Sequence, residues 1–273
     1  MSQPELALYK GEGEGKGRAY KHPTLKNADG KPHTSPSVTT VLKLCDKSGL
    51  VQWAVDIAVN WCVVNWAVLG MRSNEDAFTT ARYRYNDVRA ERACVGTGIH
   101  ETIESLHTQG WTFPELDEEQ QEIMLQWEDL NRVWAITPVL SEVTVWNHES
   151  DYAGTLDGLW EFTNRETGEF FVGLVDIKTS KNVWPEHEMQ IAALGNPTNV
   201  VMEKLPDGTW VEKPMFEFDR SVLVHLRADK WEIIEVHDTD LRLEEFLGYR
   251  GIWETQSKIK DRVKERAAAN AGF

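Results

Sequence analysis

The hydrophobic pattern of the chain changes near Pro138, and this change limits the folds open to it. Before Pro138, apolar residues recur at helical spacing, which predicts helices over 49–69, 74–93, 97–108 and 117–135. "SPSVTTVLKL" ahead of them predicts a turn and a Ser/Thr cap that enter a helix. After Pro138, "VLSEVTVW" (139–146), "YAGTLDGLWEF" (152–162) and "EFFVGLVDIKT" (169–179) predict three consecutive strands.

The remainder of the chain adds one helix to this sheet, then two strands and a final helix. "PEHEMQIAALG" has Pro at the start and Gly after the end of a predicted short helix. A hairpin at "LPDGTW", strands at "SVLVHL" and "WEIIEV", and a helix from about residue 240 follow. The predicted fold class is α+β, with a helical N-terminal half packed on a mixed central β-sheet.

The length and composition favour one large globular domain. The chain has 273 residues, of which 41% are hydrophobic and 27% charged, as in ordinary soluble proteins. Residues 1–34 are rich in Gly and Lys and predict a basic N-terminal arm or an irregular first strand. We predict a single domain over 35–273, mainly helical over 35–136, with a sheet core over 137–238 and a C-terminal helix over 239–273.

The charge and the cysteines bear on partners and compartment. A formal net charge of −15 argues against broad nonspecific attraction to nucleic acid, although basic clusters occur over 10–31 and around Arg82 and Arg84. Three widely spaced cysteines predict reduced thiols of a cytoplasmic protein, and no signal peptide is evident. The apolar stretch 50–70 contains Asp56, Asn60 and Asn65, which predicts a buried core helix rather than a membrane span.

The strand "FFVGLVDIKTSK" (170–181) ends in an acid and a base one residue apart. Side chains alternate along a strand, so Asp176 and Lys178 project from the same face, about 6 to 7 Å apart. A carboxylate that holds a divalent cation, beside an ammonium that orients or deprotonates water, suits phosphodiester hydrolysis. The structural alternative is a simple ion pair at the end of a sheet.

Two further acids lie on the preceding predicted strands. Asp157 occurs in "AGTLDGL" and could supply the oxygen ligands that Mg²⁺ prefers. An Asp-Gly turn is the alternative, but Leu-Trp-Glu-Phe continues the strand directly after it. Glu142 in "LSEVTVW" is either a third oxygen ligand or a solvated strand residue.

Glu142, "GTLDG", "VDIKT" and Gln190 in "EMQIAAL" together resemble the PD-(D/E)xK nuclease superfamily, and most closely its RecB-like branch of CRISPR-associated and phage exonucleases. The resemblance covers roughly residues 36–195. It implies that Asp157 and Asp176 bind metal, that Lys178 is the catalytic lysine and that Glu142 is an auxiliary acid. Gln190 would position the lysine or the DNA strand. His100 in "GTGIHETIE" would be a further metal ligand, although His100, Glu104 and His107 could simply share one helix face.

The chain departs from that family at two places. The family's helix motif usually reads Q-x-x-x-Y, but Leu194 stands four residues after Gln190. The role of the tyrosine, stacking or hydrogen bonding, is therefore either absent or supplied by another residue such as Tyr152 or Trp184. Many RecB-like exonucleases also bind an iron–sulfur cluster through one early and three late cysteines. Cys45 resembles the early position, yet no cysteine follows Cys94, so no cluster is expected.

The resemblance implies an Mg²⁺- or Mn²⁺-dependent exonuclease that digests DNA from its ends in recombination or repair. It also implies DNA as substrate, a possible single-strand annealing protein or recombinase as partner, and the host cytoplasm as location if the chain is phage-encoded. Three alternatives are a site-specific endonuclease on the same fold, a catalytically silent accessory protein, and a glycosidase-like hydrolase that uses Asp157 and Asp176. The last gives Lys178 no role.

Overall fold

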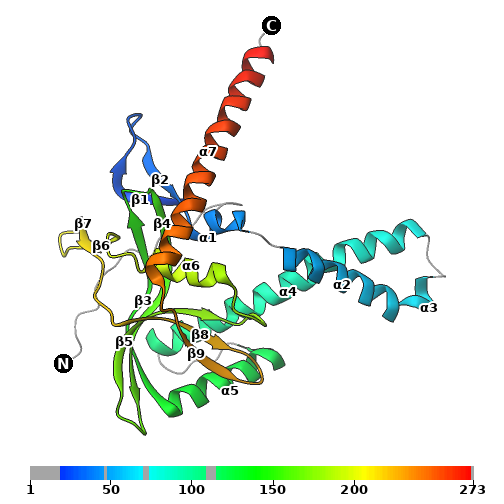
Figure 1. The fold of residues 1–273 in the computed structure, drawn as a ribbon, viewed down its shortest axis with the longest axis horizontal. Coiled ribbons are helices and arrows are strands. Elements are labelled where there is room, and N and C mark those ends of the chain that lie inside the picture. The colour runs from blue at the N-terminus through cyan, green and yellow to red at the C-terminus, as the bar shows by residue number, and fades with distance from the viewer. Residues whose placement is uncertain (1–18, 46–47, 70–73, 109–114, 272–273) are drawn as a thin grey trace. The chain divides into compact units, whose positions relative to one another are not determined.

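The structure is a computed structural model that describes residues 19–45, 48–69, 74–108 and 115–271 (Figure 1). The chain divides into two compact units. One consists of Met1–Cys45 and Met124–Phe273, and the other of Asp46–Ile123. The first holds the sheet and the second holds helices, so each is described by itself below.

The first unit is built on a seven-stranded mixed sheet (Figure 1). Its strand order among the described residues is β7-β6-β3-β4-β5-β8-β9. The strands are β3 (Trp134–Asn147), β4 (Tyr152–Asn164), β5 (Phe170–Lys178), β6 (Val200–Lys204), β7 (Trp210–Pro214), β8 (Arg220–Leu226) and β9 (Trp231–Glu235). β5 and β8 run parallel, and the other neighbours are antiparallel. The predicted α+β class and mixed sheet are confirmed; the PD-(D/E)xK type stays a prediction.

Helices α1 (Val38–Val41) and α6 (Pro185–Leu194) pack on one face of this sheet. As predicted, a Ser cap begins the first of them, because the Ser37 side chain accepts a hydrogen bond from Thr40 N. A short 3-10 helix, η1 (Leu42–Leu44), follows it. Buried apolar side chains of both helices and of the strands form one core, which includes Val41, Leu156, Leu174, Ile191 and Leu223.

The opposite face of the sheet carries an aromatic cluster. Phe162 stacks on Phe171 with ring centroids 4.7 Å apart, and Trp160 lies beside Phe162. Trp127 of helix α5 (Glu118–Val133) meets Trp160 edge to face at 5.5 Å. Edge-to-face and offset packing of this kind contributes stability beyond that gained from the area that each ring buries. The sheet is therefore covered on both faces, and its central strands are rigidly held.

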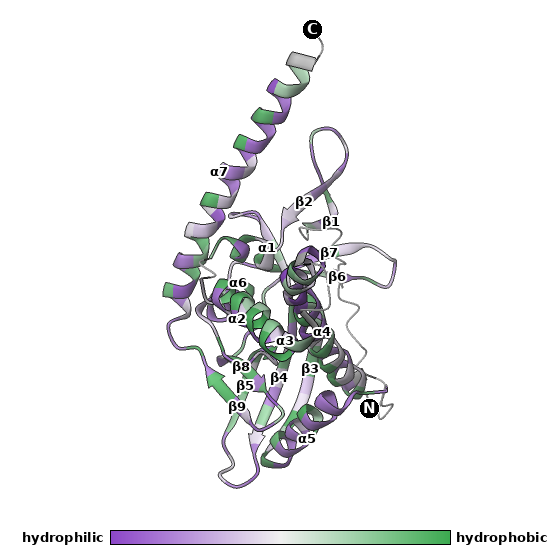
Figure 2. Cartoon of the chain, turned by 90° about the vertical axis from the view of Figure 1, so that its right-hand side faces the viewer, coloured by the Kyte–Doolittle hydropathy of each residue, from purple (hydrophilic) through white to green (hydrophobic). Residues whose placement is uncertain are grey.

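The long helix α7 (Thr239–Ala271) is anchored only through its first half. Phe246 is fully buried in the core, and the guanidinium of the buried Arg250 donates to the carbonyl and carboxylate oxygens of Asp151. Beyond Trp253 the side chains are largely exposed, Ile259 and Val263 among them. Hydrophilic and hydrophobic residues alternate along this part of α7 (Figure 2). The predicted C-terminal helix is confirmed.

Part of the predicted N-terminal arm is ordered as a two-stranded antiparallel sheet. It consists of β1 (Ala19–Lys26) and β2 (Pro32–Pro36). Tyr20 bonds Thr155 at 3.0 Å, and Ser35 donates to Asp151 at 2.7 Å, so this hairpin is tied to β4 and to the turn before it. Residues 1–18, with Lys10, Lys16 and Arg18, lie outside the described residues.

The second unit consists mainly of helices α2 (Ser48–Val64), α3 (Trp66–Leu69) and α4 (Asn74–Thr108). The prediction of two helices over 74–93 and 97–108 is wrong, because α4 runs through Gly96 and Gly98 without a break. Gly98 has a packing role instead: a Cβ there would lie 2.2 Å from the Gln120 side chain. A helix can absorb the cost of an isolated glycine when tertiary packing requires a small residue.

The prediction of a buried core helix over 50–70 is also wrong. The helix forms, but among its described side chains none is fully buried, and Val51 and Val63 are exposed. The apolar content of α2 predicts burial, but in its own unit the described side chains of α2 are exposed or only partly buried. Within the described parts of the chain, no helix combines the length and apolarity that a membrane crossing requires.

Candidate active site

The end of β5 delivers an acid and a base to the face of the sheet that α6 covers. Leu174, Asp176 and Lys178 alternate with residues that point to the other face. Asp176 is 1% exposed, and its Oδ2 lies 2.5 Å from Lys178 Nζ. A buried carboxylate requires such a partner, since burying the charge alone costs several kcal/mol or more. The apolar run of β5 therefore holds the Asp176–Lys178 pair in a fixed position.

Helix α6 adds Gln190 to this pair. Gln190 Nε2 donates to Asp176 Oδ1 at 2.8 Å, while its Oε1 accepts from Lys178 Nζ at 3.3 Å. The amide thus contacts both charged groups at once and fixes their orientation. Pro185 begins the helix, and the buried Met189 and Ile191 on either side of Gln190 anchor it in the core.

Asp157 lies where β4 and β5 stop pairing. Their ladder ends at Gly158–Val175. Two residues further along β5, Ile177 N donates to Asp157 Oδ2 at 2.6 Å instead of to a backbone carbonyl. The carboxylate therefore satisfies a backbone donor at the point where the strands separate. β4 continues through Asp157 and Gly158 as a strand, so no Asp-Gly turn forms.

Glu142 approaches Asp157 from β3. Ser141 pairs with Gly158 and Val143 with Leu156, which places Glu142 opposite Asp157. Its φ of 54° is in the left-handed region, which costs a non-glycine residue of order 1–3 kcal/mol. The carboxylate oxygens of Glu142 and Asp157 lie within 4.8 Å of each other, at partly buried positions. The strained backbone thus accompanies a close pair of acids that could bind a cation.

His100 lies on α4 in the other unit, at a partly buried position. Its predicted role as a metal ligand stays a prediction. The basic cluster around Arg82 and Arg84 lies on the same helix, where Arg84 forms ion pairs with Asp87 and Glu91.

The position that holds tyrosine in the Q-x-x-x-Y pattern lies in the hydrophobic core of this chain. Leu194 is buried, and so is Tyr152, whose hydroxyl donates to Ala193 O and whose pKa burial raises to about 12. A fully buried ring has no face for a DNA base, so the suggestion that Tyr152 replaces the missing tyrosine by stacking is wrong. Trp184 remains half-exposed directly before α6.

Introducing the tyrosine of the Q-x-x-x-Y pattern with Leu194→Tyr is expected to destabilise the fold by about 1–3 kcal/mol, because the larger ring does not fit. A Cβ on Gly154 would already lie 2.6 Å from Leu194 Cδ2. Chemical denaturation of the variant measures the change, with Leu194→Met as the control that conserves volume. A stable Leu194→Tyr protein would contradict the packing described here.

Two residues near the site were missed by sequence reasoning. His225 Nε2 lies 2.6 Å from Ser180 O, and Arg227 donates to Lys181 O at 3.3 Å. His225 lies near the end of β8 and Arg227 directly follows the strand. The pairing of His225 with Lys178 of β5 places both beside the loop after Lys178. They hold the backbone of that loop. The sequence shows only that the strand "SVLVHLR" ends in polar residues. These residues can be assigned to the site only when β8 is known to pair with β5.

The site therefore combines carboxylates and one lysine on the strands beneath α6 with one amide on α6 itself, and its carboxylate oxygens are the groups that could bind a metal. Hard oxygen donors of this kind suit Mg²⁺ or Mn²⁺ better than softer metals. The interpretation depends on geometry alone, because no protein-family model and no curated protein matches this sequence.

Proposed function

We propose that this chain is an Mg²⁺- or Mn²⁺-dependent deoxyribonuclease that digests DNA from its ends. The observation that carries the proposal is the closed set of contacts among Asp176, Lys178 and Gln190, with Asp157 at the adjacent strand separation. A structural ion pair would need neither the amide that contacts both charges nor a second acid on the adjacent strand.

The acids fit a divalent cation by their chemistry. Glu142 and Asp157 offer partly buried carboxylate oxygens within 4.8 Å of each other, and Asp176 lies one strand further along the sheet. The resemblance to the RecB-like branch also implies His100 as a metal ligand. A bound Mg²⁺ or Mn²⁺ would polarise the phosphate and lower the pKa of a water molecule.

The residues of the chain have separate roles in this proposal. Lys178 would orient the attacking water and help to remove its proton, and its charge would stabilise the negative charge of the transition state. Gln190 and Asp176 would hold the Lys178 side chain in the position seen here, through the contacts at 3.3 Å and 2.5 Å. His225 and Arg227 would act indirectly, because they fix the position of the loop after Lys178.

The overall charge shapes how DNA would reach this site. With a net charge of −15, most of the surface repels the phosphate backbone, so binding has to be local. Lys181 is exposed on the loop that follows Lys178 and is suited to a phosphate contact. A single-strand annealing protein or a recombinase would be the natural partner for the single strands that such a digestion leaves.

The direct test is a cleavage assay on linear and closed-circular duplex DNA with Mg²⁺, Mn²⁺ or EDTA. Wild type is expected to degrade linear DNA only, and only with metal. Asp157→Asn and Asp176→Asn should lower the rate by about 10²-fold or more, since each removes a charge that the transition state uses. Lys258→Ala, which removes an ion pair with Glu254 on α7, is the matched control and should cleave as wild type does.

The other outcomes are equally informative. Cutting of the circle in an Asp176-dependent manner would replace the exonuclease with an endonuclease at the same site. If folded wild type cuts neither substrate but binds DNA as well as Asp176→Asn does, the catalytic proposal is wrong and an accessory role takes its place.

A further inference from the structure

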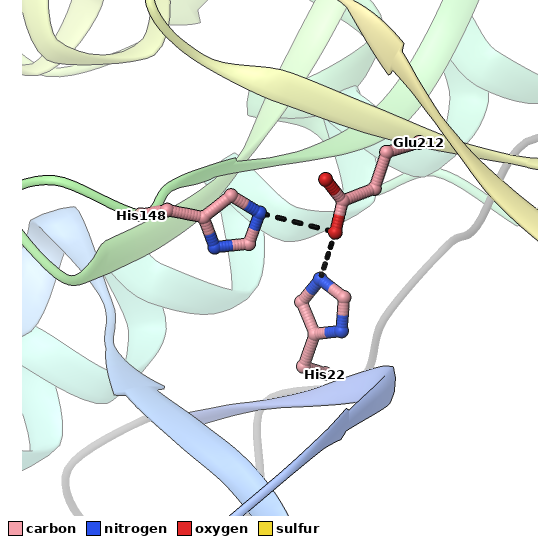
Figure 3. Close-up of side chains that lie close together, drawn as sticks. All are labelled: His22, His148 and Glu212. Atoms are coloured by element: carbon pink, nitrogen blue, oxygen red, sulfur yellow. Dashed lines mark ion pairs between the residues drawn. The ribbon is translucent and has the colours of Figure 1, made fainter.

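A second group of metal-binding side chains lies in the first unit and has no part in the proposed nuclease site. Figure 3 shows His22, His148 and Glu212, whose side chains converge from β1, from the turn after β3 and from β7. Glu212 Oε1 lies 3.2 Å from His148 Nε2 and 3.6 Å from His22 Nε2. The three elements are far apart in the sequence, so only the fold brings these donors together.

These distances match the spacing of ligands around one zinc ion. Zinc takes nitrogen at about 2.0–2.1 Å and carboxylate oxygen at about 2.0–2.2 Å in a tetrahedron, so neighbouring ligand atoms lie about 3.3–3.5 Å apart. Two of the three edges are within a few tenths of an ångström of that spacing. All three ligand atoms lie within 4.8 Å of one another, and the half-exposed His148 side chain can move to shorten the third edge.

His22 supplies independent evidence that the group is built for a ligand. It is 3% exposed, its ring meets Trp146 edge to face, and its buried Nε2 has no hydrogen-bond partner within the described structure. A buried nitrogen with no such partner is rare and calls for an explanation. Burial, and next the nearby His148, lower the pKa of His22.

The proton on the His22 ring decides what metal binding requires. Nδ1 accepts hydrogen bonds from Leu25 N at 2.9 Å and Thr24 N at 3.3 Å, so the neutral ring carries its proton on Nε2. A metal on Nε2 would move that proton to Nδ1. The two backbone amides would then have to turn away, and because Thr24 and Leu25 are exposed, water can take the place of Nδ1. Metal binding would therefore convert His22 from one tautomer to the other.

We infer that His22, His148 and Glu212 form a zinc site with two imidazoles, one carboxylate and an open fourth position. The site goes beyond the proposed nuclease function. Two imidazole nitrogens with one carboxylate favour zinc or a similar late first-row metal over Mg²⁺. His148 and Glu212 face solvent, which leaves room for a water molecule as fourth ligand. Bound zinc would fasten the β1–β2 hairpin to β7 and to the turn after β3.

The test uses Zn²⁺, and Co²⁺ as its spectroscopic substitute, with the full chain carrying Asp157→Asn and Asp176→Asn to weaken metal binding at the nuclease site. Calorimetry should show one tight equivalent, and Co²⁺ should give the absorption of a four- or five-coordinate site. His148→Ala and Glu212→Gln change exposed side chains and should each raise Kd at least tenfold, since loss of an outer-shell partner alone typically costs 10–100-fold. His237→Ala, an exposed histidine 3.5 Å from Glu235, is the matched control.

A second readout separates binding at this site from binding elsewhere. Nitrogen NMR of the histidine rings should show the His22 proton on Nε2 without metal and on Nδ1 with one equivalent of Zn²⁺. Equal Zn²⁺ affinity in the parent, His148→Ala and Glu212→Gln proteins would overturn the inference. So would a His22 ring that keeps its proton on Nε2 at saturation.

Discussion

Replacing Lys178 with methionine is expected to lower the rate of DNA cleavage by about 10²–10⁴-fold, the usual contribution of a positioned acid or base. It should also destabilise the fold, because Asp176 is 1% exposed and its Oδ2 lies 2.5 Å from the ammonium that is removed. Breaking a buried ion pair from one side typically costs about 3–5 kcal/mol. Cleavage is measured under single-turnover conditions, and stability by urea denaturation.

A double variant separates the two effects of this change. Asp176→Asn combined with Lys178→Met removes both charges, and neutral replacement of a buried pair is often close to neutral for stability. The double variant should therefore regain most of the lost stability and remain inactive. If it cleaves DNA at the wild-type rate, the pair is structural and the proposed mechanism fails. If Lys178→Met alone is as stable as wild type, the pair contributes little to the fold.

The strands of the sheet could be predicted because their signals are local. Alternation of apolar residues, together with turn residues between the strands, predicts β4 and β5 within two residues and the second half of β3, which begins at Trp134 rather than at 139. The placement of Asp176 and Lys178 on one face follows from the same alternation. The approach of Gln190 is also nearly local, because twelve residues and one short helix separate it from Lys178.

The features that escaped prediction depend on contacts between distant segments. The backbone of Glu142, which lies opposite Asp157, is strained, and no residue pattern in the sequence predicts its φ of 54°. His225 approaches Ser180 only because β8 pairs in parallel with β5. α4 continues through Gly98, although glycine is typical of helix breaks. Here the missing side chain of Gly98 lets the Gln120 side chain pack closely against the helix. In each case tertiary structure overrides a local preference.

The position of Gln190 depends on how the far end of α6 is held. The last carbonyls of a helix have no partner within it. Here Asn199 Nδ2 donates to Ala193 O and to Leu194 O, each at 2.9 Å, and its Oδ1 accepts from Asn147 Nδ2 at 3.1 Å. Asn199 is 1% exposed, so water cannot substitute for these bonds.

Asn199→Asp is therefore expected to destabilise the fold by about 3–5 kcal/mol, although it changes only one amide group. The aspartate has no donor for Leu194 O, which costs about 1–3 kcal/mol when left unpaired, while Ala193 O keeps only the Tyr152 hydroxyl. The substitution also adds a buried negative charge beside both carbonyls. The melting temperature should fall by about 10 °C. Asn164→Asp is the matched control, because Asn164 Oδ1 only accepts, from Glu166 N and Thr167 N in an exposed turn, and a carboxylate can do the same. Equal melting temperatures for the two variants would show that α6, and with it Gln190, is held in some other way.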